Sequence, residues 1–169
     1  MMKNRWKRRR LSSSQIIMLG FMGVIALGTI LLMLPFARAD AGRATFLDAL
    51  FTATSATCVT GLITQDTATY WSAFGQTVIL GLIQIGGLGV VTVAVFITRL
   101  SGRKIGLMQR STMQEAIAAP QMGGIIRMTG FILRMVVIIE GIGALALLPV
   151  LIPEFGVGRG IWYAVFHSI

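Results

Sequence analysis

Long stretches without a charged side chain constrain the fold of this chain more than any other feature. Gln15–Phe36 holds 22 residues and Phe74–Ile97 holds 24 residues without Asp, Glu, Lys or Arg. A third apolar stretch, Met128–Ile152, contains only Arg134 and Glu140. At about 1.5 Å of rise per residue, each stretch is long enough to cross a hydrocarbon core as a helix. The sequence therefore predicts an all-α membrane protein with three spanning helices.

The overall composition agrees with lipid as the solvent. Hydrophobic residues make up 55% of the 169 residues and charged residues only 12%, a ratio that a soluble domain of this size cannot bury. A signal peptide competes for the first stretch, but the stretch is too long and has no clear small-residue cleavage site. The single cysteine, Cys58, excludes a disulfide within the chain.

The positive charges are distributed unevenly along the chain. Of 15 Lys and Arg residues, which give a net charge of +9, six lie within the first ten residues and five within residues 99–127. Only Arg38 and Arg43 lie between the first two stretches. Because positive loops stay inside, we expect a multi-pass protein of the cell membrane with a basic cytoplasmic tail, residues 1–14, and a cytoplasmic linker, residues 99–127. The tail has few aromatic residues and adjoins a span, so we expect no nucleic-acid partner.

The connection Ala37–Ala73 is too long and too apolar for an ordinary outer loop. Within it, Phe46–Ala56 is a mostly apolar block that would make about 16 Å of helix, half of a span. The residues that follow, Thr57–Leu62, are rich in β-branched side chains and favour extended backbone. This pattern predicts a short helix that enters the membrane, followed by an extended segment that returns to the side from which the helix entered.

Such a segment fits an ion filter, because non-helical backbone at membrane depth is tolerated where it lines a watery cavity. Extended carbonyls would replace the water around a dehydrated cation, Gly61 would permit unusual backbone angles, and the short helix would point its negative end at the cation. The predicted ligands are the backbone carbonyls of Thr57, Cys58, Val59 and Thr60. A Thr-rich amphipathic loop lying on the membrane surface explains the same residues equally well from chemistry alone.

An internal repeat divides the chain. Leu34-Pro35 and then Ala49–Thr52 are echoed roughly 115 residues later by Leu148-Pro149 and Ala164–His167. We therefore expect a first unit of helix, pore loop and helix over residues 15–98. A second unit over residues 128–169 would break off inside its pore helix.

Three polar residues in or after the third stretch, Arg134, Glu140 and His167, could have functional roles. Glu140 lies near its middle, where a carboxylate is costly, so it is either a supporting residue of the filter or a satisfied structural carboxyl. Arg134 is expected to extend to the cytoplasmic interface. His167 is the only histidine and has neither a metal-ligand set nor a catalytic triad around it, so we expect a protein that is not an enzyme.

Several motifs resemble the KtrB-type subunits of the Ktr/Trk/HKT potassium transporter superfamily. The segment Ala49–Leu62, ALFTATSATCVTGL, resembles their first pore loop. Similarities to their second helix, first cytoplasmic linker and second unit are carried by FGQTVI at 74–79, QIGGLG at 84–89, SGRKIGL at 101–107, QEA at 114–116 and FHSI at 166–169, so the resemblance covers nearly the whole chain.

This resemblance implies four helix, pore-loop and helix units around a central pore, as in potassium channels. It implies an ion-translocating subunit for potassium uptake that needs no cofactor, with sodium dependence found in the family. It also implies a homodimer, embedded in membrane lipid, that docks on a cytoplasmic ring of nucleotide-binding regulatory subunits. Two alternatives remain: a Trk-type subunit, which would carry extra helices before the first unit, and a non-conducting assembly or anchor subunit.

Overall fold

The computed structural model describes the chain as a set of helices and connecting loops. It describes residues 12–40, 42–89, 92–93, 111–112, 114 and 125–169. Within these residues the helices are α1 (Ser13–Leu32), α2 (Phe46–Thr57), α3 (Thr67–Tyr70), α4 (Ala73–Leu88) and α7 (Ile125–Ser168). The described part contains no strand beyond one isolated bridge between Arg38 and Trp71. The prediction of an all-α chain is confirmed, while most of the basic tail and of the 99–127 linker lies outside the described residues.

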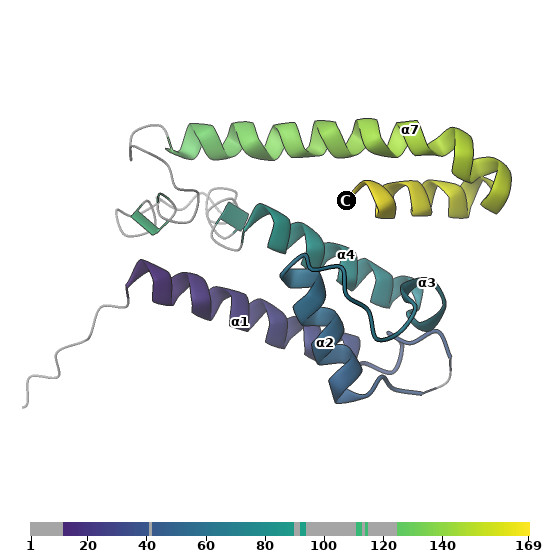
Figure 1. Cartoon of the computed structure of the whole chain (residues 1–169), viewed down its shortest axis with the longest axis horizontal. Helices are drawn as coiled ribbons and strands as arrows, with labels where there is room; N and C mark the ends of the chain where they lie inside the picture. Colours follow the sequence, from purple (N-terminus) through teal and green to yellow (C-terminus); the bar gives the residue numbers. More distant parts are fainter. Residues whose placement is uncertain (1–11, 41, 90–91, 94–110, 113, 115–124) are drawn as a thin grey trace, which may run out of the picture.

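The helices form two groups (Figure 1). Helices α1 and α4 run lengthwise with opposite directions, and α2 lies across them, packed against both. Helix α7 runs above α4 and then doubles back on itself. We call residues 125–155 its outgoing arm and residues 157–168 its return arm. The two arms touch where Gly160 lies against Ile152 and Gly143 lies against Ser168.

Two helices of the described part are long and apolar enough to cross a membrane. These are α1, with 20 residues, and the stretch Arg127–Ser168 of α7. Helix α4 is also apolar but has only 16 residues, because it ends at Leu88. Gly89 follows with φ of 81°, a conformation that glycine adopts easily and that ends a helix. The predicted spanning helix over Phe74–Ile97 is thus interrupted at Gly89, and residues 90, 91 and 94–97 lie outside the described part of the chain.

The outgoing arm of α7 continues past the point where the sequence predicted a stop. Pro149 and Pro153 both lie inside the helix, and the break comes at Gly156, whose φ is 76° and ψ 167°. A proline removes one helical hydrogen bond, whereas a reversal of direction needs backbone angles that only glycine adopts readily. The outgoing arm therefore runs past Ile152, the end of the predicted third stretch, and ends at Gly156.

The short helix predicted at Phe46–Ala56 is confirmed, with Thr57 as its last residue. Thr45 caps its amino end, because its hydroxyl accepts a hydrogen bond of 3.1 Å from the Asp48 N–H. The 12 residues of α2 span roughly 18 Å, well short of a membrane crossing.

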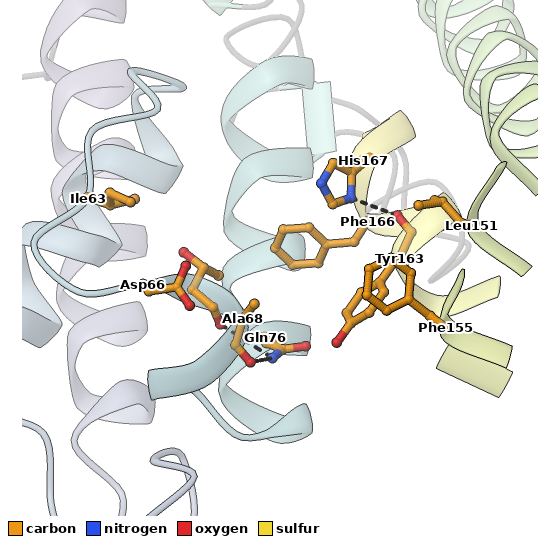
Figure 2. A pocket seen from close by; sticks show the side chains of 10 residues that line it. Ile63, Asp66, Ala68, Gln76, Leu151, Phe155, Tyr163, Phe166 and His167 are labelled. Atoms are coloured by element: carbon orange, nitrogen blue, oxygen red, sulfur yellow. Dashed lines mark hydrogen bonds between the residues drawn. The ribbon is translucent and has the colours of Figure 1, made fainter. Parts of the chain in front are cut away.

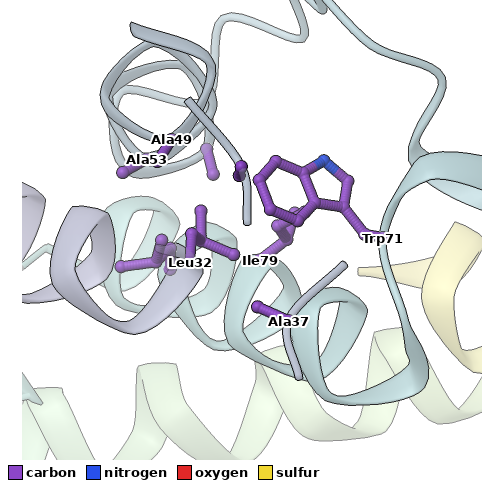
Figure 3. Packing of buried hydrophobic residues seen from close by; sticks show 9 residues of the cluster. Leu32, Ala37, Ala49, Ala53, Trp71 and Ile79 are labelled. Atoms are coloured by element: carbon purple, nitrogen blue, oxygen red, sulfur yellow. The ribbon is translucent and has the colours of Figure 1, made fainter. Parts of the chain in front are cut away.

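Small residues allow α2 to lie close to α1 and α4. Ala49, Ala53 and Ala56 fall on one face of α2 at helical spacing, and all three are buried. They pack in one cluster with large side chains from the neighbouring elements (Figure 3). A methyl group added at Gly28 of α1 would lie 2.7 Å from Leu82 Cδ1 and 3.3 Å from Ala53 Cβ. Close backbone approach through small residues is the usual way that helices pack in lipid.

Candidate functional site

The carboxyl end of α2 forms a tight turn, which we call the filter turn (residues 57–61). The Thr60 N–H donates to the Ser55 carbonyl at 3.0 Å, and the Val59 N–H donates to the Ala56 carbonyl at 3.2 Å. These two bonds are the pattern of a Schellman motif, in which the residue after the cap takes left-handed angles. Here that residue is Val59, with φ of 53°. A β-branched residue is strained in this conformation, and such strain occurs at functional sites.

The turn differs from the extended backbone that we expected at Thr57–Val59. Thr57 is still helical, and Cys58 has φ of −88° and ψ of 0°. The reason is that the turn pairs the last carbonyls of α2 with Val59 and Thr60, whereas an extended chain would leave these carbonyls unpaired. The extended-backbone prediction was wrong over these three residues.

The residues of the filter turn differ in exposure. Cys58, Val59, Thr60 and Gly61 are exposed, whereas Thr57 is only 1% exposed. The Thr57 carbonyl oxygen lies against α4, at 2.0 Å from where a β-carbon of Gly86 would stand. The structure therefore presents Val59, Thr60 and Gly61 to a cavity, leaves Cys58 exposed outside the lining of that cavity, and packs Thr57 against Gly86.

The chain that leaves the turn, which we call the return segment (residues 62–66), is fastened to α2. Ser55 Oγ donates to the Leu62 carbonyl at 2.6 Å and lies 2.9 Å from Thr60 Oγ1. Further from the turn, the Asp48 carboxylate accepts hydrogen bonds from Thr64 and Gln65. Hydroxyl side chains of Ser55, Thr60 and Thr64 thus help to hold the loop that follows α2.

Beside the filter turn lies an open cavity of about 280 Å³. Its walls come from α2, the turn and its return segment, α3, α4 and Phe166 of the return arm. Phe166 of the return arm thus lines the same cavity as the exposed residues Val59, Thr60 and Gly61.

Gln76 joins three elements, which sequence reasoning did not detect. Its Nε2 donates to the Trp71 carbonyl at 3.0 Å and to two carbonyls of the short α3, and its Oε1 accepts from Trp162 Nε1 at 2.8 Å. A second cavity, of about 440 Å³, opens beside it between the return segment and α7, with Tyr163 on its wall (Figure 2). The only sequence signal was an amide within an apolar run.

Glu140, the candidate supporting residue, pairs with an amide on α4. Gln84 Nε2 donates to both carboxylate oxygens, at 2.9 and 3.0 Å. Gln84 lies two positions before Gly86, so this pair joins α7 to the part of α4 that contacts Thr57. No described filter backbone is bonded to Glu140. Arg134 is exposed, and the Nδ1 of the exposed His167 lies 2.9 Å from the Tyr163 carbonyl.

We expect Glu140→Gln to keep ion uptake within about twofold of the wild type, because a glutamine carbonyl still accepts from Gln84. Glu140→Ala leaves the Gln84 amide unpaired and should lower stability by about 1–3 kcal/mol. Thermal unfolding in detergent and uptake in cells measure the two effects. Loss of uptake in a stable Glu140→Gln protein would instead assign a role to the negative charge.

Comparison with known proteins identifies the family. The profile of TrkH, described as a cation transport protein, matches residues 3–169. The chain belongs to the TrkH family. The TrkH family is a family of membrane transporters and not of enzymes.

Relatives of this TrkH-family chain confirm the resemblance to KtrB-type subunits. It is 44% identical over 162 residues to the potassium/sodium uptake protein NtpJ of Enterococcus hirae, covering 96% of this chain and 36% of the relative. It is 45% identical over 160 residues to the Ktr system potassium uptake protein B of Bacillus subtilis, with 95% and 36% covered. The protein B of Vibrio alginolyticus is 36% identical over 155 residues, with 92% and 34% covered. The chain thus spans about a third of the length of these relatives.

Proposed function

We propose that this chain forms part of the ion-translocating subunit of a potassium uptake system, with the filter turn as one segment of its selectivity filter. The observation that carries the proposal is an exposed, non-helical turn at the carboxyl end of a helix too short to span the membrane. The negative end of the helix dipole favours a cation at this place. The relatives named as potassium uptake proteins supply the identity of the ion.

Within the filter turn, the carbonyls of Cys58, Val59 and Thr60 are proposed as ligands of the transported potassium. Among the described residues none of these three oxygens accepts a hydrogen bond. Carbonyl oxygens without a protein partner replace the hydration shell of a dehydrated cation. We propose that Thr57 contributes differently from our first expectation, by packing the base of the filter against Gly86, and that Gly61 sets the backbone angles of the exit.

The wider architecture is proposed from the same relationship. Residues 15–98 would form one helix, pore-loop and helix unit, and residues 128–169 would begin a second, with the return arm of α7 as its pore helix. The Phe166 wall of the 280 Å³ cavity supports this placement. The amino terminus and the 99–127 linker would lie in the cytoplasm, as the charge distribution predicts.

Partners are proposed from the names of the relatives. "Ktr system" denotes a system of components, and we propose that this subunit forms a homodimer on a cytoplasmic ring of nucleotide-binding regulatory subunits. The name of the Enterococcus hirae relative includes sodium, which supports sodium dependence as a property to be measured.

The exposed thiol of Cys58 provides a direct test of the filter proposal. Silver ion is a soft cation of nearly the size of potassium and binds thiolates. In the complete protein, external silver should lower potassium uptake by about tenfold or more, because it would occupy the conduction path. Raising external potassium should slow the block.

The control is Cys58→Ser, which leaves every backbone carbonyl in place. This variant should transport potassium and resist silver. Equal sensitivity of the wild type and Cys58→Ser would contradict the placement of Cys58 in the pore. It would favour the alternative of a non-conducting assembly subunit if uptake also survived changes at Gly61.

A further inference from the structure

We propose that Asp48 is a positioning residue for the filter, because its carboxylate holds the far end of the return segment against α2. This inference rests on the proposed function. Asp48 lies in the first turn of α2, whereas the filter turn lies at the opposite end of that helix. Asp48 would therefore act on the filter through the return segment and without touching the transported ion.

The two oxygens of Asp48 have different partners. Oδ2 accepts a hydrogen bond of 2.6 Å from Thr45 Oγ1, which belongs to the cap of α2. Oδ1 accepts from Thr64 Oγ1 at 3.2 Å and from Gln65 Nε2 at 3.5 Å, and both of these belong to the return segment. The Thr45 hydrogen bond lowers the pKa of Asp48, so the group is a charged acceptor at neutral pH. Hydrogen bonds to a carboxylate are stronger than those to a neutral oxygen.

Asp48 and Ser55 bind the return segment at two positions along the axis of α2. They are seven residues apart, which places them on one face of α2 and separates them by about 10.5 Å along its axis. The four residues Leu62–Gln65, three steps along the chain, would cover roughly 10 Å when fully extended. The segment is thus long enough to reach from one attachment to the other.

Beyond Asp66, which caps α3, the return segment has few other attachments. Leu62 is 63% exposed and Ile63 is 64% exposed, so hydrophobic burial contributes little here. Gly61 has no heavy atom within 4 Å of the place where a β-carbon would stand. The orientation of the peptide groups at Thr60 and Gly61 therefore depends on the attachments on either side of them.

Thr64→Val tests this inference without disturbing the helix cap, because it removes one donor and keeps the side-chain size. In the complete transporter we expect a KM for potassium raised about tenfold, with reduced discrimination against sodium and a smaller change in the maximal rate. Asp48→Asn should act in the same direction. Since both changes break one attachment, the double variant should be no worse than the more severe single variant.

The matched control is Thr69→Val on α3. Thr69 Oγ1 donates to Asp66 Oδ2 at 2.6 Å, so the control loses a similar hydrogen bond that does not reach α2. It should leave KM and selectivity unchanged. The inference is overturned if Thr64→Val behaves like Thr69→Val, or if the effects of Asp48→Asn and Thr64→Val add fully. If Asp48→Asn fails to reach the membrane, Thr64→Val against Thr69→Val decides alone.

Failure of this inference is distinguishable from failure of the proposed function. Silver block at Cys58, with resistance in Cys58→Ser, would stand even if Thr64→Val were silent. In that case the filter turn would be a filter whose position does not depend on Asp48. Absence of the silver block, together with normal uptake in Gly61→Val, would refute the proposal that the filter turn is part of a selectivity filter.

Discussion

Replacing Gly61 with valine is expected to abolish selective potassium uptake while leaving membrane insertion intact. Gly61 has φ of 72°, and no atom crowds the position of its missing side chain. The effect of valine would therefore come from the backbone, since a left-handed conformation costs roughly 1–2 kcal/mol for an ordinary residue and more for a β-branched one. Relaxation toward negative φ would turn the neighbouring carbonyls away from the ion path. Uptake by potassium-depleted cells, normalised to protein in the membrane, measures the loss.

Gly61→Asn is the matched control, because asparagine tolerates left-handed angles better than other non-glycine residues. It should retain a substantial part of the uptake that valine removes. If Gly61→Val took up potassium as selectively and as fast as the wild type, the assignment of Gly61 to the filter would be wrong.

Gly86→Ala is expected to have the second large effect. The added methyl group would stand 2.0 Å from the Thr57 carbonyl oxygen and 2.8 Å from its carbon. Both are backbone atoms, so no side-chain rotation can relieve the clash, and α2 must move away from α4. We expect destabilisation of about 1–3 kcal/mol, as for other overpacked contacts, and a loss of uptake because the base of the filter turn shifts. Thermal unfolding and uptake should fall together.

Gly87→Ala and Gly81→Ala, on the same helix, are the controls for this prediction. Neither position has an atom within 4 Å of the added methyl group. Alanine stabilises a helix by roughly 0.5–1 kcal/mol relative to glycine, so both variants should be as stable as the wild type or more so. If Gly86→Ala matched them, the packing of Thr57 on α4 would have no importance for the filter.

The existence of α2 was predictable from local features. The apolar block is half the length of a span, Thr45 and Asp48 form a cap, and the alanines recur at helical spacing. The geometry of the filter turn was not predictable in the same way. Propensity favours extended backbone for Val59, but the hydrogen bonds that finish α2 outweigh it and hold this valine at φ of 53°.

The amides Gln76 and Gln84 illustrate a second limit. Each lies within an apolar helix, and an amide in such a helix must find partners, yet nothing in the sequence says which. Their partners, Trp162 and Glu140, lie 86 and 56 residues away. At Glu140 the sequence likewise could not name Gln84 as the partner of the carboxylate.

By itself, the sequence determined the solvent, the helical class, the half-length helix and the family, because these depend on composition, periodicity and local motifs. Tertiary structure alone decided which glycine faces another backbone, that Thr57 packs inward while Cys58, Val59 and Thr60 are exposed, and that Asp48 reaches Thr64 and Gln65. Helix propensity and hydrophobic length act between near neighbours in the chain. The contact of Thr57 with Gly86 instead joins separate helices, so it arises only once α2 has packed against α4.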